Sequence, residues 1–184
     1  MKLEVSSVTK LRLTELEKLD PVTVILEDMG PGRGKIIIES FGQSWASFWP
    51  AMGSRNIAQF FVSCDEHYLA GNLAGSIRDE VNDEDAVELA CKQAILRVRR
   101  QRPEDLSAED ARLLWDDSIG LEDLAHRHFL ISYERDLCEL LFECSFYEWD
   151  IPQKPNPYYE RLCLLIRTVQ DGLRQYLKGQ EDAA

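Results

Sequence analysis

Residues 22–41, VTVILEDMGPGRGKIIIESF, decide the fold. Two runs rich in β-branched residues, 22–28 and 35–41, stand on either side of a segment dense in glycine and proline. β-Branched side chains favour extended backbone, and glycine supplies the positive φ values that a chain reversal needs. The stretch therefore predicts two strands joined by a wide hairpin connection.

Gly34 and Lys35 also raise the question of a phosphate-binding loop. Such a loop follows the pattern G-x-x-x-x-G-K-[ST] and leads into a helix, whose N-terminus faces the phosphates. Here Met29 stands at the first glycine position, Ile36 replaces the metal-binding hydroxyl, and a strand follows. The glycines are therefore interpreted as a turn, and no cofactor is expected.

Short apolar runs extend the sheet on both sides of this hairpin. Residues 2–16 alternate partly between apolar and polar side chains, and residues 56–64 are interpreted as a fourth, half-buried strand. Between the third and fourth strands, residues 43–53 suggest a short helix that Pro50 would end. The predicted order of the first 64 residues is strand, strand, strand, helix, strand.

From Asp65 onward the apolar residues recur at helical spacing. Helices are predicted at residues 65–77, 83–102, 107–117, 120–129, 132–149 and 157–179, with a proline-rich linker at 150–157.

Strands first and helices afterwards argue for an α+β fold. We expect a mostly antiparallel sheet of about four strands with a short helix, and a helical C-terminal half packed on one face. A chain of this length closes around one core, so a single domain is expected over residues 1–179. Its β-rich part spans 1–64, its helical part spans 65–179, and residues 180–184 form a frayed tail.

The chain has no run of about 18 apolar residues and no pattern of a signal peptide at its start, so a cytosolic protein without a membrane anchor is expected. Its five cysteines form no CxxC pair. They are interpreted as reduced thiols, because cytosolic proteins rarely keep disulfides. The five are Cys64, Cys91, Cys138, Cys144 and Cys163.

The net charge of −12 argues against a protein that binds phosphate backbones, since such proteins depend on lysine and arginine. Acids and bases balance at 7 against 7 over residues 1–64, stand at 16 against 7 over 65–123, and at 10 against 7 over 124–184. The acidity is therefore concentrated in the middle of the chain.

Acidic doublets along residues 79–123 have two interpretations. Acids at helix starts are stabilised by the helix dipole, which explains a solvated face without any function. Carboxylates in such number can also resemble DNA phosphates and attract a basic protein surface. Four arginines within 97–102 could pair with these acids or form a small anion-binding site. The candidate partner-binding acids are Asp83, Glu84, Asp85, Glu109, Asp110, Asp116 and Asp117.

Trp45, Phe48 and Trp49 stand at i, i+3 and i+4, so on a short helix the three rings would share one face. Such a face is usually core. The functional alternatives are an anchor for a protein partner and a platform that stacks single-stranded nucleic acid. Stacking on single-stranded nucleic acid normally needs a basic groove as well, and the N-terminal region has no net positive charge.

Cys64 and His67 are the candidates for catalysis. A thiolate nucleophile needs a histidine within hydrogen-bonding reach, and these residues are three positions apart. Together with His126 and His128 they would also supply four ligands of the types that zinc prefers. A capped helix start with ordinary polar histidines explains the same residues, and no metal site is predicted.

The segments ESFGQSWASFWPAMG, residues 39–53, and FFVSCDEHYLAGNLAG, residues 60–75, resemble small accessory proteins of phages and prophages of enteric bacteria. The resemblance covers about residues 20–77 and implies a cytosolic, non-structural phage product that binds and redirects a host or defence protein.

We therefore predict a non-enzymatic interaction protein with an acidic surface. The alternatives are a small hydrolase or nuclease-like enzyme that uses Cys64 and His67 or a metal-binding carboxylate cluster, and a protein that binds single-stranded nucleic acid. The sequence does not predict an oligomeric state.

Overall fold

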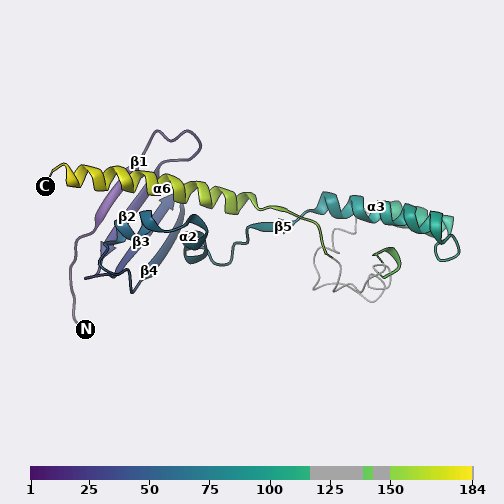
Figure 1. The fold of residues 1–184 in the computed structure, drawn as a ribbon, viewed down its shortest axis with the longest axis horizontal. Helices are drawn as coiled ribbons and strands as arrows, with labels where there is room; N and C mark the ends of the chain where they lie inside the picture. Colours follow the sequence, from purple (N-terminus) through teal and green to yellow (C-terminus); the bar gives the residue numbers. More distant parts are fainter. Residues whose placement is uncertain (117–138, 143–149, 184) are drawn as a thin grey trace. The chain divides into compact units, whose positions relative to one another are not determined.

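The computed structural model describes residues 1–116, 139–142 and 150–183 (Figure 1). The chain divides into two compact units. Unit 1 comprises Met1–Asp79 and Asn156–Ala184, and unit 2 comprises Glu80–Pro155, so unit 2 is an insertion in the sequence of unit 1. That the two fold together as a single domain over residues 1–179 stays a prediction.

Unit 1 contains a four-stranded antiparallel sheet. Its strands, β1 (Thr9–Leu13), β2 (Val22–Asp28), β3 (Gly34–Ser40) and β4 (Gln43–Trp49), lie side by side in chain order. The strand expected over residues 2–16 is thus confined to β1. In the register, Val24 lies opposite Leu11 on one side and Ile38 on the other.

The β2–β3 connection is the turn that the glycines predict. Met29 N donates to Arg33 O at 2.9 Å, and Gly30 and Gly32 have φ values of 112° and 65°. A Cβ on Gly32 would lie 2.2 Å from the carbonyl oxygen of Gly53, so no larger residue fits there. The loop is held by neighbouring backbone, and a strand follows it, as the sequence predicts.

The β3–β4 connection is a two-residue turn formed by Phe41 and Gly42, which have φ values of 50° and 77°. Positive φ at both central residues is the property of a type I′ turn, which Asn-Gly adopts best. The Phe41 side chain is 82% exposed. It therefore combines an unfavourable backbone conformation with little packing.

Replacing Phe41 by Asn is expected to raise the free energy of unfolding by about 1 kcal/mol, because asparagine tolerates the left-handed region far better. Urea unfolding of the variant measures the gain. The control is Gln43→Asn at the neighbouring exposed strand position, where φ is not positive and no gain is expected. A loss of stability in Phe41→Asn would contradict the turn assignment.

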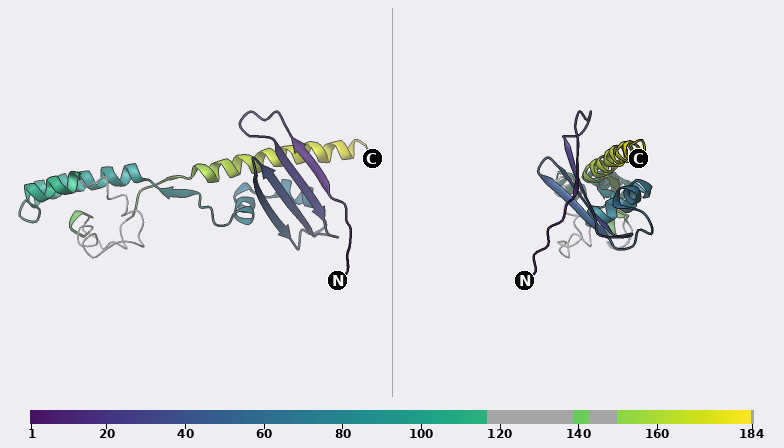
Figure 2. Two further views of the ribbon diagram at one scale, coloured as in Figure 1. Left: turned by 180° about the vertical axis from the view of Figure 1, so that it is seen from behind. Right: turned by 90° about the vertical axis from the view of Figure 1, so that its left-hand side faces the viewer.

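Three helices cover one face of the sheet: α1 (Ile57–Ser63), α2 (Glu66–Leu73) and α6 (Pro157–Glu181) (Figure 2). The core between them and the sheet includes the fully buried Val22, Ile36, Ile38, Phe61 and Ile166. Gln170 on α6 is also buried, and its side-chain amide donates to the carbonyl oxygens of Phe61 and Cys64 at 3.1 and 2.9 Å. The α+β class is therefore confirmed, with the sheet first and the helices after it.

Two elements of the predicted order are wrong. Residues 43–53 were expected to form a helix, but 43–49 form β4, because the tight turn at Phe41 returns the chain directly alongside β3. Residues 56–64 were expected to form a strand, but 57–63 form α1. Asn56 caps this helix in a reciprocal capping box with Gln59, and that device favours a helix over a strand.

Unit 2 has its own hydrophobic cluster, built mainly on α3 (Glu84–Gln101) and α4 (Ala108–Asp116). The cluster includes the fully buried Val87, Cys91, Ile95 and Leu141. Two short strands, β5 (Glu80–Asn82) and β6 (Gln153–Pro155), pair antiparallel where the chain enters and leaves the unit. The helix predicted over 120–129, and that over 132–149 apart from residues 139–142, lie outside the described residues.

Cys64, Cys91 and Cys163 form no disulfide, as expected for reduced cysteines; Cys91 and Cys163 are buried and Cys64 is half-buried. Cys138 and Cys144 lie outside the described residues. No helix within the described parts of the chain is at once long and apolar enough to cross a membrane.

Candidate functional site

The acids at the start of α3 divide into one paired residue and two exposed ones. Asp83 is the N-cap, where its carboxylate accepts from Ala86 N at 3.3 Å and pairs with Lys154 Nζ at 3.4 Å. Glu84 and Asp85 follow in the first turn, and both are exposed. The helix dipole favours acids here, but Glu84 and Asp85 also face solvent and are accessible to a partner.

The start of α4 repeats this arrangement. The hydroxyl of Ser107 accepts from Asp110 N at 3.0 Å and donates to Asp110 Oδ2 at 2.6 Å. Glu109 and Asp110 lie in the first turn, and Asp116 lies at the end of the helix; all three are exposed. Asp117 lies outside the described residues.

Three of the four arginines of residues 97–102 donate hydrogen bonds to backbone carbonyl groups. Arg97 donates to the carbonyl oxygen of Leu141, and Arg102 donates to that of Leu140 at 3.1 Å. Arg99 donates to the carbonyl oxygen of Leu106 at 2.6 Å. The expected pairing with acids is present at Arg102 and Asp105, 3.6 Å apart. These arginines therefore tie together segments of unit 2.

The division into units separates the charge sharply. Unit 2 holds 19 of the 33 acidic residues and 9 of the 21 lysines and arginines, which makes its net charge −10. Unit 1 holds the remaining 14 acids and 12 bases, a net charge of −2. The inserted segment therefore carries −10 of the protein's net charge of −12.

The three aromatic residues do not share a face, because they lie on a strand. Trp49 is buried between Phe60 and Phe61, with ring centroids 5.6 and 6.3 Å away, and its Nε1 donates to the hydroxyl of Tyr68 at 3.0 Å. Trp45 is half-buried against the same core. Phe48 points to the other face of the sheet and is 49% exposed. The helical face predicted for these rings is wrong.

Cys64 and His67 belong to different helices. Cys64 is the C-cap of α1, whereas His67 lies in the first turn of α2, so one helical turn does not join them. His67 Nδ1 lies 2.7 Å from the hydroxyl of Tyr159 on α6, and the two rings stack. Burial raises the pKa of the Cys64 thiol, although the positive charge of Arg55 opposes this. A raised pKa keeps the thiol protonated and makes it a poorer nucleophile.

Alkylation of the native protein tests whether the Cys64 thiol is a poor nucleophile. At pH 8 we expect Cys64 to react with iodoacetamide at least several times more slowly than free cysteine, because both its raised pKa and its partial burial reduce accessible thiolate. Peptide mass mapping at timed intervals measures the rate. His67→Ala is expected to leave it unchanged, whereas a fast reaction that slows in His67→Ala would identify a thiolate–imidazole pair.

Of the four zinc ligands considered from the sequence, Cys64 and His67 lie within the described chain. Among residues 1–116, 139–142 and 150–183, no three His, Cys, Asp or Glu side chains are grouped so that they could hold a metal ion. His126 and His128, the other histidines proposed as zinc ligands, lie outside these residues.

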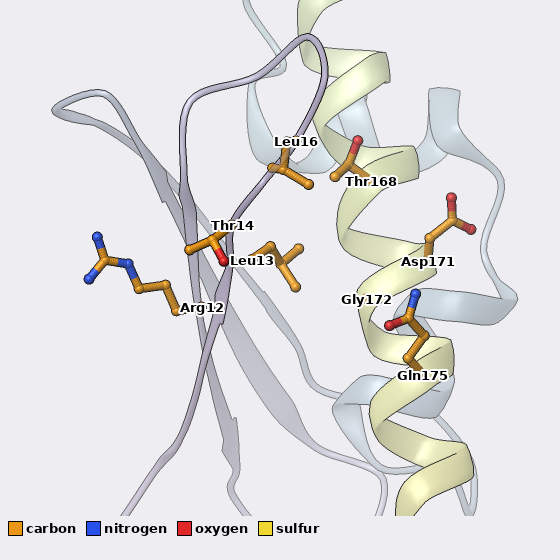
Figure 3. A pocket seen from close by; sticks show the side chains of 8 residues that line it. All are labelled: Arg12, Leu13, Thr14, Leu16, Thr168, Asp171, Gly172 and Gln175. Atoms are coloured by element: carbon orange, nitrogen blue, oxygen red, sulfur yellow. The ribbon is translucent and has the colours of Figure 1, made fainter.

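A pocket of about 430 Å³ lies in unit 1 between the end of β1, the loop that follows it, and α6 (Figure 3). Leu13 and Leu16 point toward α6, whereas Arg12 points away from it. The polar groups of Thr168, Asp171 and Gln175 lie on the helix side and are exposed or half-buried. Ligand sites usually fix orientation with preorganised polar groups, and no lining polar side chain here is fully buried.

The comparisons with known proteins give one family. The family model Phage_phiTE_072, described as a phage family, matches residues 1–175. Neither the curated proteins nor the solved structures contain a match to the chain. Because the matched residues include all of unit 2 and most of unit 1, the chain belongs to this phage family.

Proposed function

We propose that this phage protein is a non-enzymatic accessory protein that acts in the bacterial cytosol by binding a host or defence protein. The acidic surface of unit 2 meets a basic surface on the partner, where its carboxylates take the place of nucleic-acid phosphates. Unit 1, with its four-stranded sheet and covering helices, serves as the scaffold into whose sequence unit 2 is inserted.

The observation that carries this proposal is the net charge of −10 on residues 80–155, against −2 on the rest of the chain. Acids that only face solvent would not have to be concentrated in one unit. Concentrated charge of one sign raises the rate of encounter with a basic partner and suppresses encounters with acidic ones. Arg97, Arg99 and Arg102 donate to backbone carbonyl oxygens. Their guanidinium groups are therefore already hydrogen-bonded within unit 2.

The experiment is capture from bacterial lysate by the immobilised full-length protein at low salt, followed by identification of the retained protein and titration of its binding. Between about 50 and 500 mM NaCl we expect the Kd to rise at least tenfold, because salt screens exposed charges. An affinity that is independent of salt would contradict electrostatic recognition.

A matched pair of triple variants locates the surface. Glu84→Gln, Asp85→Asn and Glu109→Gln remove three exposed acids of unit 2 and are expected to weaken binding at least tenfold at low salt. Glu15→Gln, Glu17→Gln and Glu39→Gln remove three exposed acids of unit 1 and change the net charge by the same amount. Equal weakening by the two triple variants would show that only total charge matters and would remove unit 2 as the binding surface.

A further inference from the structure

The two edges of the sheet in unit 1 differ in charge. A sheet edge presents unpaired N–H and C=O groups, and proteins usually protect it with charged side chains, proline or a bulge. At one edge, β1 carries the exposed Lys10 and Arg12. At the other edge, β4 has the sequence QSWASFW, and none of its seven residues is charged.

The outer side of β4 is free within the described chain. The strand order ends at β4, and among the described residues no hydrogen bond joins its outward backbone groups to another element. Ser44 and Ala46 are exposed, as is Phe48 on the same face. Trp45, on the helix-covered face, is only half-buried although it packs against the core. Apolar surface therefore borders this open edge on both faces of the sheet.

The sequence of β4 is complementary to itself. If two copies of the strand pair antiparallel about Ala46, each large side chain faces a small or polar one and no charges meet. The opposed pairs are Ala46 with Ala46, Trp45 with Ser47, Ser44 with Phe48, and Gln43 with Trp49.

We propose that β4 is a homodimer interface, at which β4 of one copy pairs antiparallel with β4 of a second copy about Ala46. The pairing joins the two four-stranded sheets into one sheet of eight strands. It satisfies the outward backbone groups of both strands and lets the neighbouring copy cover the exposed surfaces of Phe48 and Trp45. A twofold axis through the pair makes the interface closed, so association stops at the dimer.

A second copy is favoured over a strand from another protein because the complementarity is internal to β4. The center of the symmetric pair is its smallest side chain, Ala46, and large and small residues alternate about it. Cross-strand neighbours of this kind stabilise antiparallel pairs through their side-chain contacts. The proposal concerns unit 1 and is independent of the acidic surface of unit 2.

Sedimentation equilibrium of the full-length protein tests the association. We expect a dimer of the 21.2 kDa chain at about 50 µM. Ala46→Lys places like charges opposite each other at the centre of the interface and is expected to weaken the dimer at least tenfold. The control, Thr23→Lys, adds the same charge to the same face on the central strand β2 and is expected to leave the dimer intact.

Cysteine cross-linking tests the register. Opposed residues in an antiparallel pair have Cβ atoms about 4.5–5.5 Å apart, so Ala46→Cys is expected to give a disulfide-linked dimer on mild oxidation. Ser44→Cys is the control, because Ser44 faces Phe48 and its counterpart lies roughly 14 Å away, beyond the reach of a disulfide. Non-reducing electrophoresis against the wild-type chain, whose own cysteines set the background, gives the result.

Each of three outcomes would overturn the proposal. They are a monomer at all concentrations tested, a dimer that Ala46→Lys does not weaken, and cross-linking as efficient at position 44 as at position 46. Loss of the dimer in Thr23→Lys but not in Ala46→Lys would instead indicate stacking of the open sheet faces.

Discussion

Replacing Glu80–Pro155 with the two residues Asn-Gly is expected to leave a folded unit 1. Asn156 N donates to the carbonyl oxygen of Asp79 at 2.8 Å, which is the bond that closes a four-residue β-turn when two residues stand between the partners. Asn156 Nδ2 also donates to the carbonyl oxygen of Arg78 at 2.7 Å. The two ends of the insertion are therefore already held at the spacing of a turn.

The cores support the same expectation. The buried residues of unit 1 form one hydrophobic cluster drawn only from residues 22–73 and 162–173, and those of unit 2 form another. Excision removes the second cluster without opening the first. The shortened chain should unfold cooperatively in urea, and its net charge should change from −12 to −2 because unit 2 carries −10.

The same variant separates folding from binding. If unit 2 is the partner-binding surface, the shortened protein loses salt-dependent capture while it keeps its circular dichroism and its unfolding transition. As a control, Asn156→Ala in the shortened chain removes the bond to Arg78 and the cap of α6, and it should lower the free energy of unfolding by about 1–3 kcal/mol. An unfolded or aggregated shortened chain would instead support the single domain predicted over residues 1–179.

The sequence predicts the β2–β3 hairpin well because its information is local. Two β-branched runs and a connection rich in glycine are sufficient, and both Gly30 and Gly32 have the positive φ that such a connection needs. Helix starts are also predicted closely, since Asp83, Ser107 and Asn156 cap α3, α4 and α6 from within a few residues. These features depend on neighbours in the chain.

The exchange of helix and strand over residues 43–64 has a different cause. The spacing of Trp45, Phe48 and Trp49 fits a helix, while Trp45 and Trp49 alone also fit one face of a strand. The turn that decides between them is occupied by Phe41 in place of the usual asparagine, so its local signal is weak. For α1, the decisive signal was the capping pair Asn56 and Gln59, which the strand prediction overlooked.

In the candidate sites, too, features that depend on neighbouring residues could be predicted, whereas contacts between distant residues could not. The acids at helix starts could be placed from sequence, because their positions follow from the helix ends. The partners of Arg97 and Arg102 could not, since they are carbonyl groups 44 and 38 residues away. The boundaries of unit 2 were hidden as well: β5 and β6 have only three residues each, too few for a recognisable strand pattern.

The second large effect is expected from Trp49→Ala, which should lower the free energy of unfolding by about 3–5 kcal/mol. Trp49 is only 4% exposed. The substitution removes its contacts with Phe60 and Phe61 and leaves the hydroxyl of Tyr68 without its indole donor. Urea unfolding at a fixed protein concentration measures the loss.

Phe48→Ala is the matched control, because it removes an aromatic ring from the adjacent position of the same strand. In the single chain the Phe48 side chain is 49% exposed on the opposite face of the sheet, so at a protein concentration low enough to keep the chain monomeric its loss should cost about 1 kcal/mol or less. The ratio of the two effects reports the alternation of side chains along β4. Similar losses from the two substitutions would indicate a shared face, which is the arrangement of a helix, and would contradict both the strand and the free edge on which the proposed dimer depends.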